Sequence, residues 1–98
     1  MTKEEKTRAL QAFAYAIRKA GGQAMLAIAL DCSQARVSRI ANDESEISAA
    51  MAVTIERRYG IPRHDFRPDL YDRPRSKKKP VDYSALIAKH DRASNKAA

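Results

Sequence analysis

Residues 23–42, QAMLAIALDCSQARVSRIAN, contain two short apolar-patterned segments on either side of a polar break. The break is Asp31-Cys32-Ser33, and Ser33 can start a helix because its hydroxyl oxygen accepts a hydrogen bond from a first-turn backbone N–H. Small Ala27 stands where two helices would approach each other. The apolar side chains that would hold the crossing are Leu26, Leu30, Val37 and Ile40. The stretch therefore predicts two helices of about eight residues joined by a tight turn, which is the helix-turn-helix pattern.

A longer helix is predicted before this unit. Thr2 and Glu5 have the spacing of a capping box, and Gly21-Gly22 provides a helix end. The apolar positions between them that recur with helical spacing are Leu10, Phe13, Ala14 and Ile17. These signals predict one helix that ends directly before the 23–42 stretch.

A fourth helix is predicted after the unit. An acidic, turn-rich loop covers residues 42–46, and Ser48 can cap a helix that ends at Gly60. The residues expected to face inward from it are Met51, Ala52, Val53 and Ile55. We therefore predict an all-α domain of four helices over residues 1–60.

The rest of the chain has a different composition. Prolines occur only at positions 62, 68, 74 and 80, and proline disfavours helix interiors, so residues 61–80 are predicted to be extended. Residues 61–98 carry a net charge of +5, whereas residues 1–60 carry +2, and the densest basic run is residues 73–79. Most of the positive charge therefore lies outside the predicted domain.

Residues 81–98 allow a further helix or a disordered tail. The side chains that such a helix would place on one face are Tyr83, Leu86, Ile87 and His90. A face this narrow does not hold an isolated helix in water. The segment is therefore expected to pack on the first domain, to pack on a second subunit, or to stay disordered.

The sequence argues against several classes of protein. No apolar run approaches the ~20 residues of a membrane span, and the first residues lack the apolar core of a secretion signal. We therefore expect a cytoplasmic protein that does not bind membranes. Lone Cys32, with only two histidines in the chain, provides no metal set, so we expect no metal and no cofactor, and Cys32 is expected to be a small buried residue.

His64-Asp65 resembles part of a catalytic pair, but no nucleophile accompanies it, so no catalytic residue is predicted and the chain is not expected to be an enzyme. We expect a structural role instead, in which Asp65 or Asp69 bonds a nearby arginine or backbone amide. The residues expected to anchor this segment to the core are Phe66, Leu70 and Tyr71.

The second helix of a helix-turn-helix unit enters the major groove of DNA and needs short polar side chains facing outward. Glutamine can bond adenine, arginine can bond guanine, and an alanine methyl can contact a thymine methyl. The residues predicted to contact bases are Gln34, Ala35, Ser38 and Arg39. The residues predicted to contact phosphates are Gln23, Ser33, Arg36, Asn42, Lys77, Lys78 and Lys79. The net charge of +7 also favours a polyanionic partner.

The unit is similar to that of the Cro and repressor class of phage regulators, in which two glutamines at the places of Gln23 and Gln34 support each other. AIRKAGGQAMLAIALDCSQARVSRI, followed by RHDFRPDLY at residues 63–71, resembles the YdaS-like group of prophage Cro-type regulators over about residues 10–71. The resemblance implies a lambda-repressor-like fold and a transcription regulator of phage or prophage origin.

Two features depart from that group. Asp31 stands where glycine is usual, and a left-handed conformation there costs an aspartate more than a glycine. The loop after the predicted recognition helix is acidic, with Asp43, Glu44 and Glu46. Since these carboxylates would repel phosphates, we expect them to lie away from the DNA backbone or to face a neighbouring protomer.

Two functions are consistent with these observations. The preferred one is a sequence-specific repressor that binds operator double-stranded DNA as a homodimer or higher oligomer, since pairing two small domains on adjacent half-sites increases specificity. The alternative is a protein-interaction module that acts as the antitoxin-like partner of a toxin. Ordering of residues 81–98 only with a partner, together with no DNA binding by the first domain, would favour the second.

Overall fold

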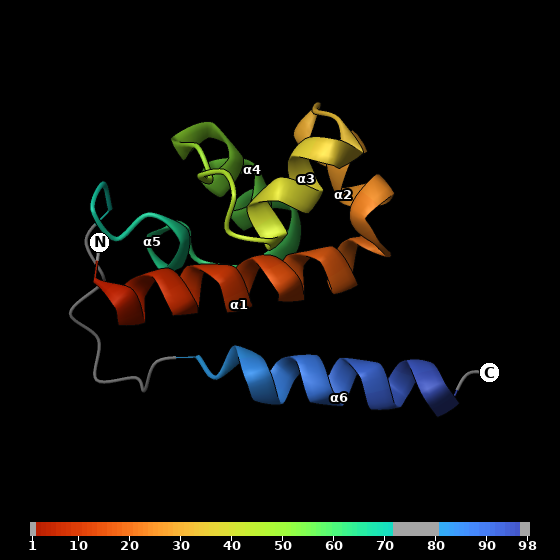
Figure 1. The fold of residues 1–98 in the computed structure, drawn as a ribbon. Coiled ribbons are helices and arrows are strands. Elements are labelled where there is room, and N and C mark those ends of the chain that lie inside the picture. The colour runs from red at the N-terminus through yellow and green to blue at the C-terminus, as the bar shows by residue number, and fades with distance from the viewer. Residues whose placement is uncertain (1, 72–80, 97–98) are drawn as a thin grey trace.

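The computed structural model describes residues 2–71 and 81–96, which form helices and connecting turns without strands (Figure 1). The helices are α1 (Lys3–Ala20), α2 (Gln23–Leu30), α3 (Gln34–Ala41), α4 (Ala49–Tyr59), α5 (Arg63–Phe66) and α6 (Tyr83–Lys96). The prediction of an all-α chain is confirmed for the described residues.

Local capping explains where α1 and α4 begin and end. The Thr2 hydroxyl accepts from the Glu5 backbone N–H at 3.1 Å, and the Glu5 carboxylate accepts from the Thr2 N–H at 2.8 Å, which completes the capping box of α1. Gly21 ends α1 with φ +98°, a left-handed conformation that glycine adopts without a Cβ penalty. Ser48 caps α4, and Gly60 ends it.

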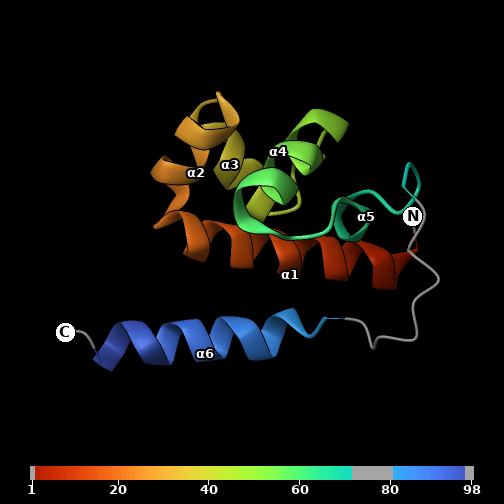
Figure 2. The same cartoon turned by 180° about the vertical axis from the view of Figure 1, so that it is seen from behind.

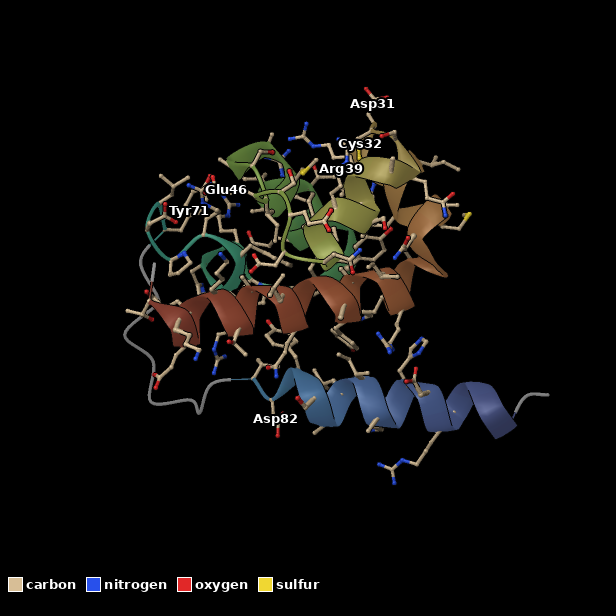
Figure 3. All side chains as sticks on the ribbon, in the orientation of Figure 1. Asp31, Cys32, Arg39, Glu46, Tyr71 and Asp82 are labelled. Atoms are coloured by element: carbon tan, nitrogen blue, oxygen red, sulfur yellow. The ribbon has the colours of Figure 1, made fainter. Side chains whose placement is uncertain are left out.

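Helix α1 lies between two groups of helices. Helices α2 to α5 cover one side of it, and α6 lies along the other side in the same direction as α1 (Figures 1 and 2). Figure 3 shows the same division: Asp31 lies at the α2–α3 end of the molecule, and Asp82 lies on the opposite side with α6. The two faces of α1 are therefore both used for packing.

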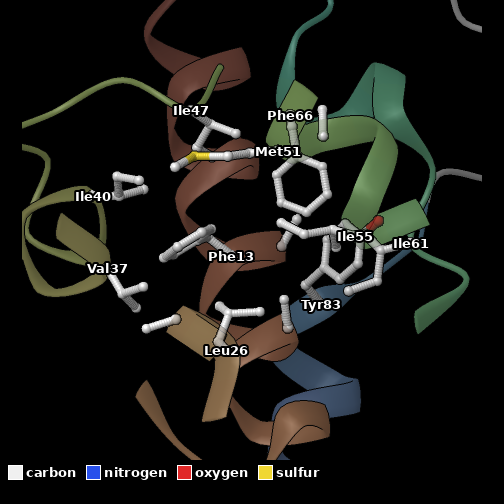
Figure 4. Packing of buried hydrophobic residues seen from close by; sticks show 14 residues of the cluster. Phe13, Leu26, Val37, Ile40, Ile47, Met51, Ile55, Ile61, Phe66 and Tyr83 are labelled. Carbon is white, nitrogen blue, oxygen red and sulfur yellow. The ribbon is translucent and has the colours of Figure 1, made fainter. Parts of the chain in front are cut away.

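The core contains side chains from every helix (Figure 4). Its fully buried large members are Phe13, Leu26, Val37, Ile40, Ile55, Phe66 and Tyr83. On the α1 side the buried positions are Ala9, Ala12, Phe13 and Ala16, so small residues allow the neighbouring helices to approach closely. Met51, Ala52 and Ile55 of α4 are buried as predicted, and Val53 is half-buried.

Helix α6 packs on α1 of the same chain, which decides between the three alternatives that the sequence left open. Tyr83 is 2% exposed, and Leu86, Ile87 and His90 are half-buried. Two hydrogen bonds from α1 add to this packing: the Arg8 guanidinium donates to the Val81 carbonyl, just before α6, at 3.2 Å, and the Arg18 Nε donates to Asp91 within α6 at 2.9 Å. Packing on α1 buries apolar side chains of α6, which stabilises a helix that would not be stable in isolation.

The prediction that residues 61–80 are extended is wrong for α5. Pro62 stands directly before the first helical residue, where its missing N–H and its φ of −58° are compatible with a helix start. Leu70 was expected to anchor this segment but is 53% exposed, whereas Phe66 is buried and Tyr71 is half-buried under the Arg63 guanidinium. The basic run at 73–79 lies outside the described residues.

Candidate functional site

The connection between α2 and α3 is a tight turn of three residues. Asp31 has φ +54° and ψ +48°, so it adopts the left-handed conformation expected at this position, and the Cys32 N–H donates to the Ala27 carbonyl at 3.0 Å. The Ser33 Oγ accepts from the Arg36 backbone N–H at 3.2 Å, as predicted for the cap of α3. The turn therefore fixes α3 relative to α2 by backbone and capping hydrogen bonds.

Helix α3 has one fully buried face and one exposed face. Val37 and Ile40 are 0% exposed and pack in the core with Leu26 and Ala27 of α2, while Leu30 is partly buried. The exposed residues of α3 are Gln34, Ala35, Arg36 and Arg39, and Ser38 is half-buried. At 100° per residue, Gln34, Ala35, Ser38 and Arg39 fall within an arc of about 140° on the side of α3 opposite Val37 and Ile40. Arg36 precedes Ile40 by four residues and lies about 40° from it, at the border between the exposed and the buried side. The predicted base-contacting residues therefore share one outer face.

The two cations of α3, Arg36 and Arg39, are available for a ligand. Over residues 2–71 and 81–93, no carboxylate lies within 4.0 Å of the guanidinium of Arg36 or Arg39. Figure 3 shows Arg39, Cys32 and Asp31 on the side of the molecule remote from α6. The outer face of α3 is thus cationic, polar and uncovered by the rest of the described chain.

The residues predicted to contact phosphates differ in their exposure and in their place in the fold. Gln23 begins α2 and is half-buried, while Ser33, Arg36 and Asn42 are exposed at the ends and side of α3. No hydrogen bond joins the Gln23 and Gln34 side chains, both of which the structure describes. Lys77, Lys78 and Lys79 lie outside the described residues.

The acidic loop between α3 and α4 turns toward α1 and α5. Asp43 has φ +62°, and its carboxylate forms an ion pair with Lys6 of α1 at 3.2 Å. Asp43, Glu44 and Glu46 line a cavity of about 400 Å³ together with residues of α1 and α5. Of these acids, Asp43 is therefore partnered by α1 of the same chain.

Asp65 of α5 is a buried carboxylate that accepts a hydrogen bond from the Tyr83 hydroxyl of α6. His64 Nε2 lies 3.4 Å from the other Asp65 oxygen. Burial, and next the bond to Asp65, raise the pKa of Tyr83 above its ordinary value. The expected bond to an arginine occurs at Asp69 instead, which accepts from Arg67 at 3.1 and 2.8 Å, and this bond lowers the pKa of Asp69.

Arg63 and Arg67 also hold α5 in place, a role that the sequence reasoning missed. The Glu56 carboxylate accepts from the Arg63 backbone N–H at 2.8 Å and from its Nε at 2.9 Å, and these bonds lower the pKa of Glu56. The Arg67 Nη1 donates to the Ile47 carbonyl at 2.9 Å. The polar residues of the 63–69 stretch therefore serve the fold.

Neither a metal-binding group nor a membrane-spanning helix is found in the described part of the chain. No group of three or more histidine, cysteine, aspartate or glutamate side chains suited to a metal ion occurs among residues 2–71 and 81–93. Cys32 is partly rather than fully buried and packs against the core. None of the described helices combines the length and apolar character needed to cross a bilayer.

Comparison with curated proteins and with solved structures found no significant match to the chain. The family described as Bacterial toxin YdaS matches residues 13–75, which include α2, α3, α4 and α5 entirely and the C-terminal part of α1 from Phe13 onward. This range contains both the α2–α3 turn and the 63–69 stretch whose polar contacts hold α5. Since the match covers well over half of the chain, the protein belongs to the YdaS family.

Proposed function

We propose that the chain is a sequence-specific DNA-binding transcription regulator of phage or prophage origin that represses by occupying operator double-stranded DNA. The observation that carries the proposal is the outer face of α3, where exposed Gln34, Ala35 and Arg39 project from a helix whose inner face is fully buried. In this proposal α2 and α3 form a lambda-repressor-like helix-turn-helix unit.

The bases would be contacted by α3 inserted into the major groove. Gln34 can bond the N6 and N7 of adenine, Arg39 can bond the O6 and N7 of guanine, and the Ala35 methyl can contact a thymine methyl. Ser38 is half-buried and reaches less far, so its hydroxyl would contact a base only where α3 lies deep in the groove.

The phosphates would be contacted around both helix starts. Gly22 provides no side-chain cap for α2, which leaves the first backbone N–H groups of α2 and the Gln23 amide available to an anion. The Ser33 oxygen accepts from the Arg36 N–H, so its own hydroxyl hydrogen remains available to donate. Arg36 and Asn42 would add contacts, and the lysines at 77–79 would add non-specific attraction.

Repression in this proposal requires occupancy and no reaction. The chain acts in the cytoplasm, at the nucleoid, without metal or cofactor. One α3 reads few base pairs, so two copies on adjacent half-sites would provide useful specificity, and the operator would then be a near-palindrome with half-sites about one helical turn apart.

The test begins with selection of bound fragments from random DNA, followed by fluorescence anisotropy on the recovered site and on a scrambled site. Arg39→Ala should weaken binding to the recovered site by about 1–3 kcal/mol and relax one base preference. Arg36→Ala should weaken binding to both sites alike and reduce the salt dependence.

The matched control is Arg92→Ala, which removes one exposed arginine from α6, on the far side of α1. Its effect on the recovered site should be small, because Arg92 is remote from α3. No enrichment of any sequence in the selection, or equal losses for Arg39→Ala on both DNAs, would contradict the proposal.

The family description favours a second candidate function, in which the chain is one component of a toxin pair and acts through a protein partner. Its description names a toxin, whereas the sequence suggested the toxin's partner. Expression of the chain alone in a bacterial host, compared with expression of a variant carrying Arg36→Ala and Arg39→Ala, separates the two functions. Growth arrest that persists in this double variant would favour the second candidate.

A further inference from the structure

A groove lies between the N-terminal half of α1, the loop 43–47 and α5, and encloses about 400 Å³. We call it the acidic groove. Its lining includes apolar side chains, which we call its floor: the core residues Ile40, Ile47 and Phe66, at most 6% exposed, and half-buried Leu10. Such a surface can accept an apolar side chain from outside because it offers dispersion contacts and excludes water.

The rim of the acidic groove carries more carboxylates than cations. Lys6 is paired with Asp43 at 3.2 Å, and Arg67 is paired with Asp69 at 2.8 Å. Glu44 and Glu46 are exposed and have no cation within 4.0 Å over residues 2–71 and 81–93. The rim therefore has an excess of two negative charges on a chain whose formal charge is +7.

The loop that carries these carboxylates is held in place by backbone contacts. The Glu44 N–H donates to the Arg39 carbonyl at 2.7 Å, and the Ile47 carbonyl accepts from Arg67 at 2.9 Å. The Lys6–Asp43 ion pair ties the same loop to α1. A groove fixed in this way needs little ordering when a ligand binds, which favours affinity.

We propose that the acidic groove binds a cationic segment of a partner protein, one with an apolar side chain between lysine or arginine residues. The apolar floor would take the apolar side chain, and Glu44 and Glu46 would pair with the flanking cations. Nucleic acid does not fit, since its phosphates would meet unpaired carboxylates. The groove is thus a surface for protein contact, separate from the outer face of α3.

The test uses the full ¹⁵N-labelled chain and a synthetic pentapeptide with one leucine between two pairs of lysines. Amide shifts should be concentrated at residues 6–10, 43–47 and 66–67. Two control peptides, with glutamate in place of lysine and with serine in place of leucine, should bind more weakly. Circular dichroism checks that each protein variant is folded.

The decisive variant is the double substitution Glu44→Gln and Glu46→Gln, which should weaken peptide binding about five- to tenfold through the loss of two exposed charge pairs. The matched control removes two exposed carboxylates elsewhere, by Glu4→Gln and Asp31→Asn, and should change the affinity less than about twofold through long-range attraction alone.

Three results would overturn the proposal. Equal losses in the two double variants would mean general charge attraction without a site. Shifts that map away from the groove, or equal binding of the glutamate peptide, would remove the assigned surface. Self-association of the free chain that is lost with Glu44→Gln and Glu46→Gln would identify a second copy as the occupant in place of a different protein.

Discussion

Replacing Tyr83 by phenylalanine removes one oxygen atom from the contact between α6 and the rest of the fold. The ring of Tyr83 is 2% exposed, and its hydroxyl donates to the buried carboxylate of Asp65. Phenylalanine keeps the buried ring and its apolar contacts. The change in the free energy of unfolding therefore reports the hydroxyl–carboxylate bond alone.

The expected loss is about 2 kcal/mol. A hydrogen bond to a charged group contributes about 1.5–3 kcal/mol, and removal of the donor leaves a buried acceptor without that partner. His64 Nε2 lies 3.4 Å from the other Asp65 oxygen and still partly compensates the buried carboxylate when the Tyr83 hydroxyl is removed. The expected loss of stability therefore falls in the lower half of that range. For a domain of this size, such a loss lowers the melting temperature by about 8–16 °C.

Urea and thermal unfolding followed by circular dichroism at pH 7 provide the measurement. The control is Tyr15→Phe, because Tyr15 is half-buried with its ring centroid 6.0 Å from that of Tyr83, and its hydroxyl has no hydrogen bond to a described residue. A loss for Tyr83→Phe no larger than that for Tyr15→Phe would refute the reasoning.

The pH dependence of the same pair has a definite sign. Since burial and the bond to Asp65 raise the pKa of Tyr83 above 10.0, the folded chain holds the phenol proton more tightly than the unfolded chain does. This contribution is fully present below about pH 10 and is lost as the pH rises through the raised folded pKa. Wild-type stability should therefore fall more steeply above pH 10 than that of Tyr83→Phe, and parallel curves would contradict this.

Three further changes test local features of the fold. Glu56→Gln should flatten the acid limb of the curve of unfolding free energy against pH. Hydrogen bonds from Arg63 lower the folded pKa of Glu56. The stability that this carboxylate contributes is therefore present above the ordinary pKa of 4.5 and is lost as the pH falls through the lower folded pKa. Urea unfolding at a series of pH values checks this, and equal acid slopes would count against it. Asp31→Gly should stabilise the chain by about 0.5–1 kcal/mol, because glycine avoids the left-handed Cβ penalty but has more freedom in the unfolded chain. An unchanged or lower melting temperature would show that the penalty is absent. Ser33→Ala should cost about 1 kcal/mol through loss of the bond to the Arg36 N–H, measured by urea unfolding, and Ser33→Asp should restore most of it.

Much of the local structure could be predicted because the signals are contained in a few neighbouring residues. The Thr2 and Ser33 caps and the glycine after α1 involve contacts within one helical turn, so they act before any tertiary packing. Pro62 was misinterpreted, since a proline disrupts a helix interior but is compatible with a helix start, and only the packing of α5 decides which applies.

The candidate site also combines features that could be predicted from the sequence with features that depend on tertiary packing. The outer face of α3 could be predicted, because Val37 and Ile40 determine by periodicity which side of the helix is buried. A hydrogen bond between Gln23 and Gln34 would depend on side-chain rotamers across two helices, and none joins these two side chains in the structure. The place of the acidic loop depends on Lys6, which lies far from it in the sequence.

The sequence by itself determined that four helices occupy residues 1–60, where these helices end, and which face of α3 is free, because these properties follow from capping and from the 3.6-residue period. Only the tertiary structure decided that α6 lies on α1, that Tyr83 bonds Asp65, and that the acids of loop 43–47 frame an apolar groove. The physical reason is that these contacts join residues distant in sequence, and their geometry is set by how whole helices pack rather than by any local preference.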